Sequence, residues 1–135
     1  MNDYPPNLTV AVSYDPGIMV AMLMPTMRNV LLCSSDPLLV KSLSNVLRDE
    51  GFVVDTVEHP AFAVKKVLRS NFDVVIVDSE PFGMSAEEAT LAIKAVSPRM
   101  PVLMIGNACD GFPASFIWKP VDLEAFRRAV QLAMA

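Results

Sequence analysis

The segment Asp73-Val-Val-Ile-Val-Asp78 places four apolar residues in a row between two aspartates. A short run that is apolar on both sides of a strand is typical of a parallel sheet with helices on both faces. The segment Asn29-Val-Leu-Leu-Cys33 has the same character. These two runs predict central strands of one parallel sheet.

Strands and helices alternate around these two runs. Further strands are predicted at residues 52–57, 101–105 and 114–118. Helix starts are marked by Asp36-Pro37, by Pro60, by the capping box Ser85-Ala-Glu-Glu88 and by Asp122. Five strands alternating with helices imply a parallel sheet with right-handed crossovers. The residues expected on the buried helix faces are Leu39, Leu43, Val46, Leu47, Ala63, Val64, Val67, Leu68, Ala89, Ala92, Ile93, Val96, Leu123, Phe126, Ala129 and Val130.

In parallel sheets of this kind, functional sites form beyond the carboxyl ends of the strands. We therefore expect the site at one edge of the sheet, where polar and small residues follow the strands. The residues predicted at this edge are Ser34, Ser35, Asp78, Gly106, Asn107 and Lys119.

The first 27 residues differ from the rest of the chain. They hold two acids and no base, whereas all 11 basic residues lie at or after Arg28. We predict an apolar N-terminal extension at residues 1–27 and a domain at residues 28–135. A strand at 8–14 and a turn at 15–17 lead to the apolar run 18–24, which is either a strand or a short helix. A second interpretation is that translation starts at Met27.

Composition excludes several classes of protein. Hydrophobic residues make up 53% of the 135 residues and charged residues 19%, so the chain has enough apolar surface to fold. The apolar run 18–24 is far shorter than the roughly 20 residues of a membrane span. A net charge of −4 argues against nucleic acid as the main partner. Two cysteines, Cys33 and Cys109, fit a reducing cytoplasm.

Three segments resemble the receiver domain of bacterial response regulators, the phosphoryl-accepting module of two-component signalling. They are Val30-Leu-Leu-Cys-Ser-Ser-Asp-Pro-Leu-Leu39, Phe72-Asp-Val-Val-Ile-Val-Asp78 and Phe116-Ile-Trp-Lys-Pro120. The resemblance extends from Arg28 to Ala135. It implies a flavodoxin-like α/β fold with five parallel strands in the order 2-1-3-4-5.

The resemblance assigns family roles to individual positions. Asp78 stands at the position of the phosphoryl-accepting aspartate, and Lys119, followed by proline, stands at that of the site lysine. Ser34 and Ser35 replace the two acids that hold Mg²⁺ in the family. Gly106 replaces the threonine or serine that binds phosphoryl oxygens, and Phe116 stands at the position of the switch aromatic. Asp36, Glu80 and Asn107 are expected at the edge of the pocket.

Losing the two acids changes the charge of the site. Three carboxylates and one lysine sum to −2, which a divalent cation neutralises, whereas Asp78 and Lys119 alone sum to zero. At an effective dielectric near 20, each lost carboxylate removes an attraction on the order of several kcal/mol. We therefore expect no metal and no cofactor. Asp36 is expected to cap a helix, and Glu80 either recruits a metal weakly or pairs with Lys119.

A second departure from the family concerns shape. Only ten steps separate Gly106 from Phe116, with Gly111 and Pro113 between them, so the fourth helix is expected to be missing or reduced to a loop. Its loss would uncover apolar sheet surface. We expect residues 18–24 to cover this surface, in the same subunit or in a neighbouring one.

The function expected from these features is that of a stand-alone degenerate receiver, or pseudo-receiver. It would act in two-component signalling through protein contacts that need no phosphorylation, and it would not be an enzyme. The expected partner is a histidine kinase, another regulator or a second copy of the chain. Trp118 is either an interface residue or strand packing, and Cys109 is either a redox sensor or an ordinary thiol. The alternative is a phosphoryl-accepting receiver that uses Asp78 with a weakened Mg²⁺ site, in which Glu80 and Asp36 replace the lost acids. Mg²⁺ is expected as a cofactor only under this alternative.

Overall fold

The structure, a computed structural model, describes residues 27–78, 85–106 and 115–134. The expectations for residues 1–26, Glu80, Asn107 and Cys109 lie outside the described residues. Within them, the elements are β1 (Asn29–Cys33), α2 (Pro37–Asp49), β2 (Val53–Val57), α3 (Pro60–Arg69), β3 (Val74–Asp78), α4 (Ala86–Val96), β4 (Val102–Gly106), β5 (Ser115–Trp118) and α5 (Leu123–Ala133).

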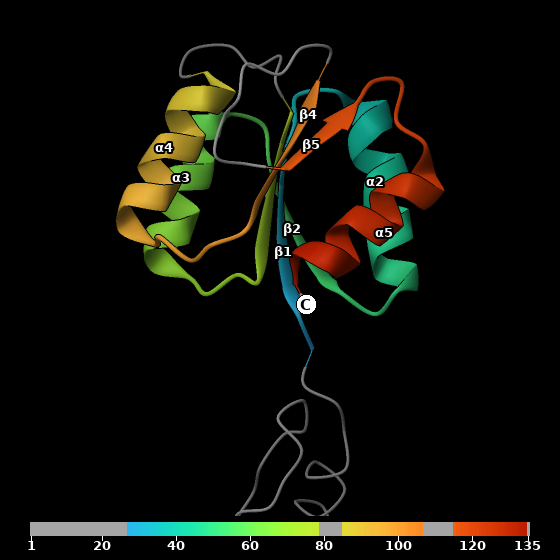
Figure 1. Cartoon of the computed structure of the whole chain (residues 1–135), viewed down its shortest axis with the longest axis horizontal. Helices are drawn as coiled ribbons and strands as arrows, with labels where there is room; N and C mark the ends of the chain where they lie inside the picture. The colour runs from blue at the N-terminus through green and yellow to red at the C-terminus, as the bar shows by residue number, and fades with distance from the viewer. Residues whose placement is uncertain (1–26, 79–84, 107–114, 135) are drawn as a thin grey trace, which may run out of the picture.

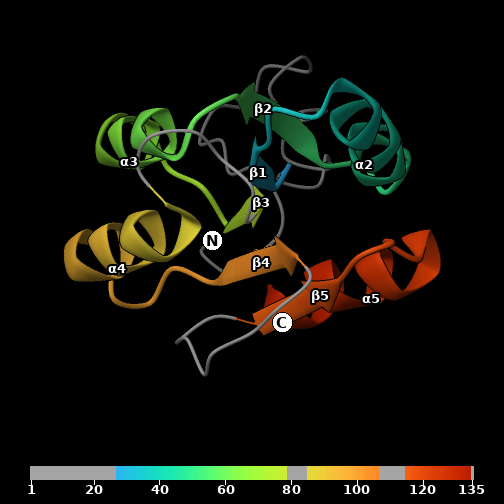
Figure 2. The ribbon, with the colours of Figure 1, turned by 90° about the horizontal axis from the view of Figure 1, so that it is seen from above.

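The strands form one parallel sheet in the order β2-β1-β3-β4-β5. Helices α3 and α4 lie on one face of the sheet, and α2 and α5 lie on the other (Figures 1 and 2). This is the flavodoxin-like order expected from the sequence. Eight residues, 107–114, join β4 to β5, fewer than the dozen or more of an ordinary parallel crossover. The helix that was expected to be missing is the family's helix between β4 and β5, not the helix labelled α4 here. That expectation concerns residues 107–114, which the structure does not describe.

Side chains of the central strands point alternately to the two faces of the sheet and form one apolar layer on each face. On the α2–α5 face, Val30, Leu32 and Ile76 pack with Phe126 and Val130 of α5. On the α3–α4 face, the cluster holds Leu31, Cys33, Val75, Val77, Met104 and Ile93. All five residues of β3 are buried, as expected for a central strand covered on both faces.

Local signals in the sequence set the helix ends. Asp36 Oδ1 accepts hydrogen bonds from the backbone N–H groups of Leu38 and Leu39, at 3.0 and 3.3 Å, and Pro37 opens α2. Ser85 Oγ accepts from the Glu88 N–H at 3.0 Å at the start of α4. Beyond the end of α2, Gly51 adopts a φ of +88°, which glycine tolerates without strain. None of the helices in the described ranges is long and apolar enough to span a bilayer.

Three residues expected on buried helix faces are exposed instead, so those predictions were wrong. Leu68, Val96 and Leu123 are 60%, 52% and 44% exposed. Leu68 and Val96 belong to the last turns of α3 and α4, and Leu123 is the first residue of α5. Apolar periodicity identifies the inward stripe of a helix, but it does not show that a helix end runs past the sheet that would cover it.

Candidate functional site

Asp78 ends β3 at the carboxyl edge of the sheet, and its side chain is almost fully buried. The register explains its nearest neighbour. Cys33 of β1 lies opposite Val77 of β3, so the next residues, Ser34 and Asp78, leave the sheet side by side. The Ser34 hydroxyl donates a hydrogen bond of 2.8 Å to Asp78 Oδ2. Ser34, which was expected at this edge of the sheet in the position of a lost acid, is thus a direct partner of Asp78.

Lys119 reaches the same carboxylate from the other side. Its Nζ lies 2.7 Å from Asp78 Oδ1. Lys119 follows β5, and its backbone N–H donates to the Gly106 carbonyl at the end of β4 at 2.9 Å. Two strand spacings, about 10 Å, separate β3 from β5, and the long lysine side chain spans this distance to reach Asp78. The structure therefore brings together three of the predicted residues, namely Asp78, Lys119 and Ser34.

Asp36, the predicted acid that follows β1, interacts with α2 and with Ser34. It caps α2 with its carboxylate, while its backbone N–H donates to Ser34 Oγ at 3.1 Å. Asp36 is exposed, as is Ser35. The Asp36 N–H and the Asp78 carboxylate together fix Ser34, whose hydroxyl accepts from one and donates to the other.

The donor set can be compared with the needs of Mg²⁺, which prefers several oxygen ligands including carboxylates. Each oxygen of the Asp78 carboxylate already has a protein partner, and the contact with Lys119 balances its charge. No group of three His, Cys, Asp or Glu side chains within residues 27–78, 85–106 and 115–134 has the geometry of a metal site. These residues are a poor match for a resident magnesium ion.

Comparison with known proteins gives the family. The model of the response regulator receiver domain matches residues 30–131.

The chain belongs to the response regulator receiver domain family.

Curated relatives of this receiver domain are larger proteins. The transcriptional regulatory protein GlrR of Escherichia coli K12 is 33% identical over 115 residues, covering 78% of this chain and 26% of GlrR. The transcriptional regulatory protein QseF of Escherichia coli O157:H7 gives the same values. The chain thus spans about a quarter of the length of the curated relatives it matches.

Solved structures show the same fold. The chemotaxis response regulator CheY4 of Vibrio cholerae superposes with a TM-score of 0.74 at 24% identity, covering 80% of this chain and 99% of that one. A receiver domain protein from Methanospirillum hungatei JF-1 has a TM-score of 0.74 at 18% identity, with coverage of 81% and 94%. At these identities the similarity establishes the fold alone.

Burial next to the site shapes the chemistry of Cys33. This receiver's Cys33 is 1% exposed and precedes Ser34. Burial, together with the negative charge of Asp78, raises the pKa of its thiol from 9.0 to about 12. Cys33 is therefore a protonated, unreactive core residue at neutral pH.

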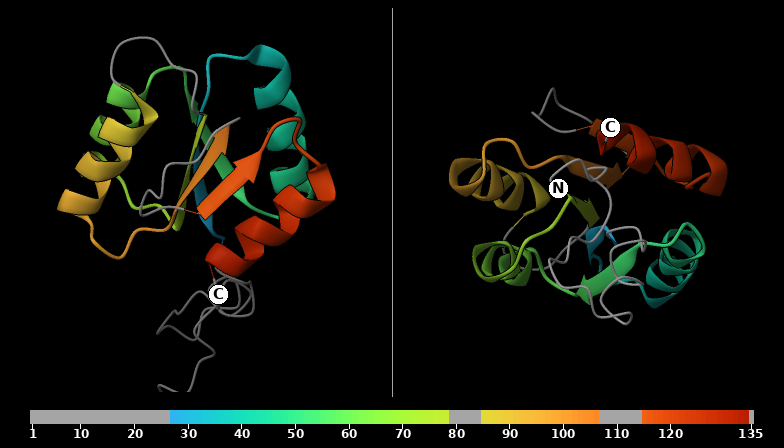
Figure 3. Two further views of the ribbon diagram at one scale, coloured as in Figure 1. Left: turned by 45° about the horizontal axis from the view of Figure 1, so that its top comes forward. Right: turned by 90° about the horizontal axis from the view of Figure 1, so that it is seen from below.

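Two aromatic residues of β5 lie on the α3–α4 face of the receiver. Phe116, at the switch-aromatic position, is partly buried against the core cluster of that face. Trp118 packs edge-on against it, with ring centroids 4.9 Å apart, yet is 59% exposed. β5 is one of the two edge strands of the sheet, and β2 is the other (Figure 3). Trp118 was expected to be either an interface residue or part of the strand packing. Packing against Phe116 covers only part of its side chain, and the rest is exposed.

Proposed function

We propose that this receiver domain works through protein contacts that do not require phosphorylation, and that it needs neither Mg²⁺ nor another cofactor. Family membership makes it a receiver of a two-component response regulator, which is a signalling domain. Its signalling would depend on protein contacts and not on phosphoryl transfer. Asp78 would then have a structural role instead of a nucleophilic one.

The observation that carries the proposal is the Ser34–Asp78–Lys119 arrangement. Phosphoryl transfer to an aspartate builds negative charge on the transferred group and on the acceptor, and that charge requires preorganised cations or hydrogen-bond donors. Here the one nearby cation, among the described residues, is in contact with Asp78 itself. Ser34 occupies the second oxygen of the carboxylate. Gly106 has no hydroxyl to offer a phosphoryl oxygen.

The surface we assign to partner contact contains Trp118. Tryptophan is enriched among residues that dominate binding energy at interfaces, and an outermost strand exposes unpaired backbone groups to a second chain. A second copy of the chain is the partner we expect there. A histidine kinase or another regulator remains the expected partner in signalling.

Incubation with acetyl phosphate and Mg²⁺, followed by intact-mass measurement, tests the proposal. We expect the wild-type chain to gain no phosphoryl group. A triple variant, Ser34→Asp with Ser35→Asp and Gly106→Thr, restores the family's residues and should gain one. Adding Asp78→Asn to the triple variant should abolish that gain, which identifies the modified residue. Stoichiometric phosphorylation of the wild type at Asp78 would overturn the proposal in favour of a phosphoryl-accepting receiver.

A further inference from the structure

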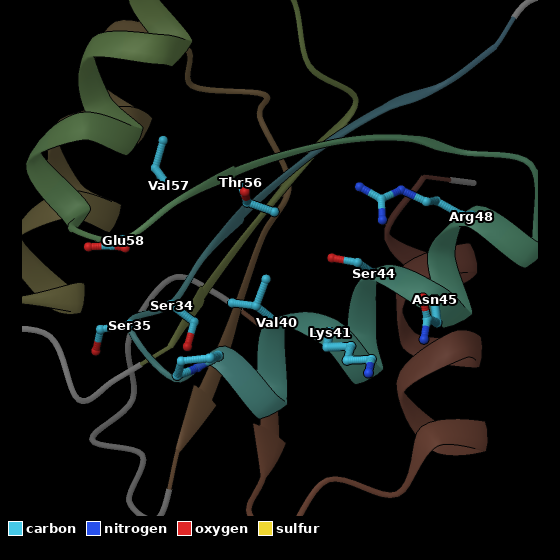
Figure 4. A pocket seen from close by; sticks show the side chains of 11 residues that line it. Ser34, Ser35, Val40, Lys41, Ser44, Asn45, Arg48, Thr56, Val57 and Glu58 are labelled. Atoms are coloured by element: carbon cyan, nitrogen blue, oxygen red, sulfur yellow. The ribbon is translucent and has the colours of Figure 1, made fainter.

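A groove of about 510 Å³ lies between α2 and β2, on the sheet face opposite α3 and α4. Its lining includes Lys41, Ser44 and Arg48 from α2 and Thr56 from β2. Figure 4 shows the Ser44 hydroxyl and the Arg48 guanidinium extending from the helix toward the strand at Thr56. This volume falls in the range of about 300–1,000 Å³ that is typical of small-molecule sites.

Ser44 is the feature that distinguishes this groove. The residue is 3% exposed, and its Oγ has no hydrogen-bond partner in the described part of the chain. Buried polar atoms in folded proteins nearly always have a partner, so an exception beside a cavity is a donor that a water or a ligand oxygen can satisfy. Ser34 also lines the groove, but its hydroxyl is already engaged with Asp78.

The charges around the groove favour an anion. Lys41 and Arg48 are seven residues apart on α2, two helical turns, and therefore share one side of the helix. Neither has an acidic partner within salt-bridge distance among the described residues. One acid, Glu58, lines the opposite part of the groove, which leaves the lining with a net charge of +1 in a chain of −4.

We propose that the groove between α2 and β2 binds a phosphorylated small molecule of mononucleotide size. Its phosphate would lie between Lys41 and Arg48, because a phosphate offers several acceptor oxygens and matches the donors of a guanidinium. Ser44 would donate to an oxygen of the ligand deeper in the groove. The groove adjoins the Asp78 site through Ser34, but its ligand would be held by α2 and not by Asp78, which gives the domain a second kind of input.

A second basic cavity on the other sheet face provides the control. This cavity, of about 440 Å³, is lined by Lys65, Lys66 and Arg69 of α3. Lys66 lies 3.9 Å from Asp55, and no buried, unpartnered hydroxyl lines this cavity. Positive charge alone is therefore present at both places, and only the groove beside α2 adds the buried donor.

The test is a ¹⁵N NMR titration of the full chain with AMP and, separately, with inorganic phosphate, at ionic strength held constant with NaCl. We expect AMP to cause saturable shifts at the amides of Ser44, Arg48 and Thr56, and inorganic phosphate to bind more weakly. Lys41→Gln/Arg48→Gln should weaken AMP binding at least about tenfold, since two charge-assisted contacts are lost. The control Lys65→Gln/Arg69→Gln, with the same change in charge, should leave it unchanged.

Ser44→Ala separates a ligand contact from a structural one. We expect several-fold weaker AMP binding with an unchanged or higher melting temperature, because the hydroxyl has no partner to lose. Absence of saturable shifts with AMP would overturn the proposal, as would equal weakening by the α3 variant. Binding of inorganic phosphate as tight as that of AMP would overturn the assignment to an organic phosphate.

Discussion

The Ser34 hydroxyl donates a 2.8 Å hydrogen bond to Asp78 Oδ2. An acid at this position would repel Asp78 and require a cation to hold the two together. A hydroxyl does the opposite, since it stabilises the ionised carboxylate directly. With Lys119 on the other oxygen, the aspartate is satisfied by the protein alone.

Ser34→Asp should restore the repulsion. Placing a second carboxylate at this buried position should lower the free energy of unfolding by about 2–4 kcal/mol in the presence of EDTA, because two like charges then lie close together. Excess Mg²⁺ should recover part of the loss by binding the folded state. Urea unfolding monitored by circular dichroism measures both effects.

The matched control is Ser35→Asp. Ser35 is exposed, so an added charge there should change stability by no more than about 0.5 kcal/mol. Equal effects of the two substitutions would mean that the Ser34–Asp78 contact is not what holds the site together.

Lys119→Met should destabilise the fold by about 2–3 kcal/mol. The substitution leaves the Asp78 carboxylate, 6% exposed, without the cation 2.7 Å away. The figure is below that for a fully buried pair because the lysine side chain is 20% exposed. The double variant Asp78→Asn/Lys119→Met should be more stable than Lys119→Met alone. A double-mutant cycle from urea unfolding measures this coupling, and strictly additive effects would contradict the ion pair.

Cys33 should make stability fall at high pH. Its pKa is about 12 in the folded protein against 9.0 ordinarily, so above pH 9 the unfolded chain loses this proton while the folded chain keeps it. The unfolded state then binds fewer protons, and stability decreases as pH rises from 9 toward 12, by at most about 1.4 kcal/mol per pH unit. Urea unfolding of a Cys109→Ser chain at pH 8 to 10.5 measures the slope.

Adding Cys33→Ala to that background removes the thiol and should flatten the slope. Other groups that titrate at alkaline pH contribute equally to both chains and cancel in the comparison. Identical slopes would show that Cys33 ionises as easily in the fold as outside it.

Trp118→Ala should weaken self-association with little effect on folding. Because Trp118 is 59% exposed, its removal should cost less than about 1 kcal/mol of stability, whereas an interface tryptophan contributes about 2 kcal/mol or more. Sedimentation equilibrium measures the dimerisation constant. Phe62→Ala, which removes an aromatic ring 49% exposed on α3, is the control and should leave association unchanged. Equal loss in both variants would argue against a specific contact at β5.

Local signals allowed much of the fold to be predicted from the sequence. The cap at Asp36, the capping box from Ser85 to Glu88 and the apolar run of β3 each need only neighbouring residues to take effect. The meeting of Asp78 and Lys119 followed from the resemblance and from the rule that parallel strands end at one edge. The parallel register could also have placed Ser34 beside Asp78, but its role as a hydrogen-bond donor required side-chain positions.

Features that depend on how elements pack could not be predicted. The groove beside Ser44 exists because of the spacing between α2 and β2, and periodicity on α2 alone places Ser44 simply among buried positions. The exposure of Trp118 depends on which elements reach β5, and strand alternation does not report that. Exposed helix ends such as Leu68 have the same origin.

The most direct test of the central claim is a ¹⁵N NMR titration of the wild-type chain with MgCl₂, followed by beryllofluoride, which mimics an acyl phosphate. A site that is already neutralised by Lys119 and hydrogen-bonded by Ser34 predicts no saturable shifts at the amides of Asp78, Gly106 or Lys119. Saturable Mg²⁺ binding at Asp78, with further shifts when beryllofluoride is added, would contradict the account and establish a working phosphoryl acceptor.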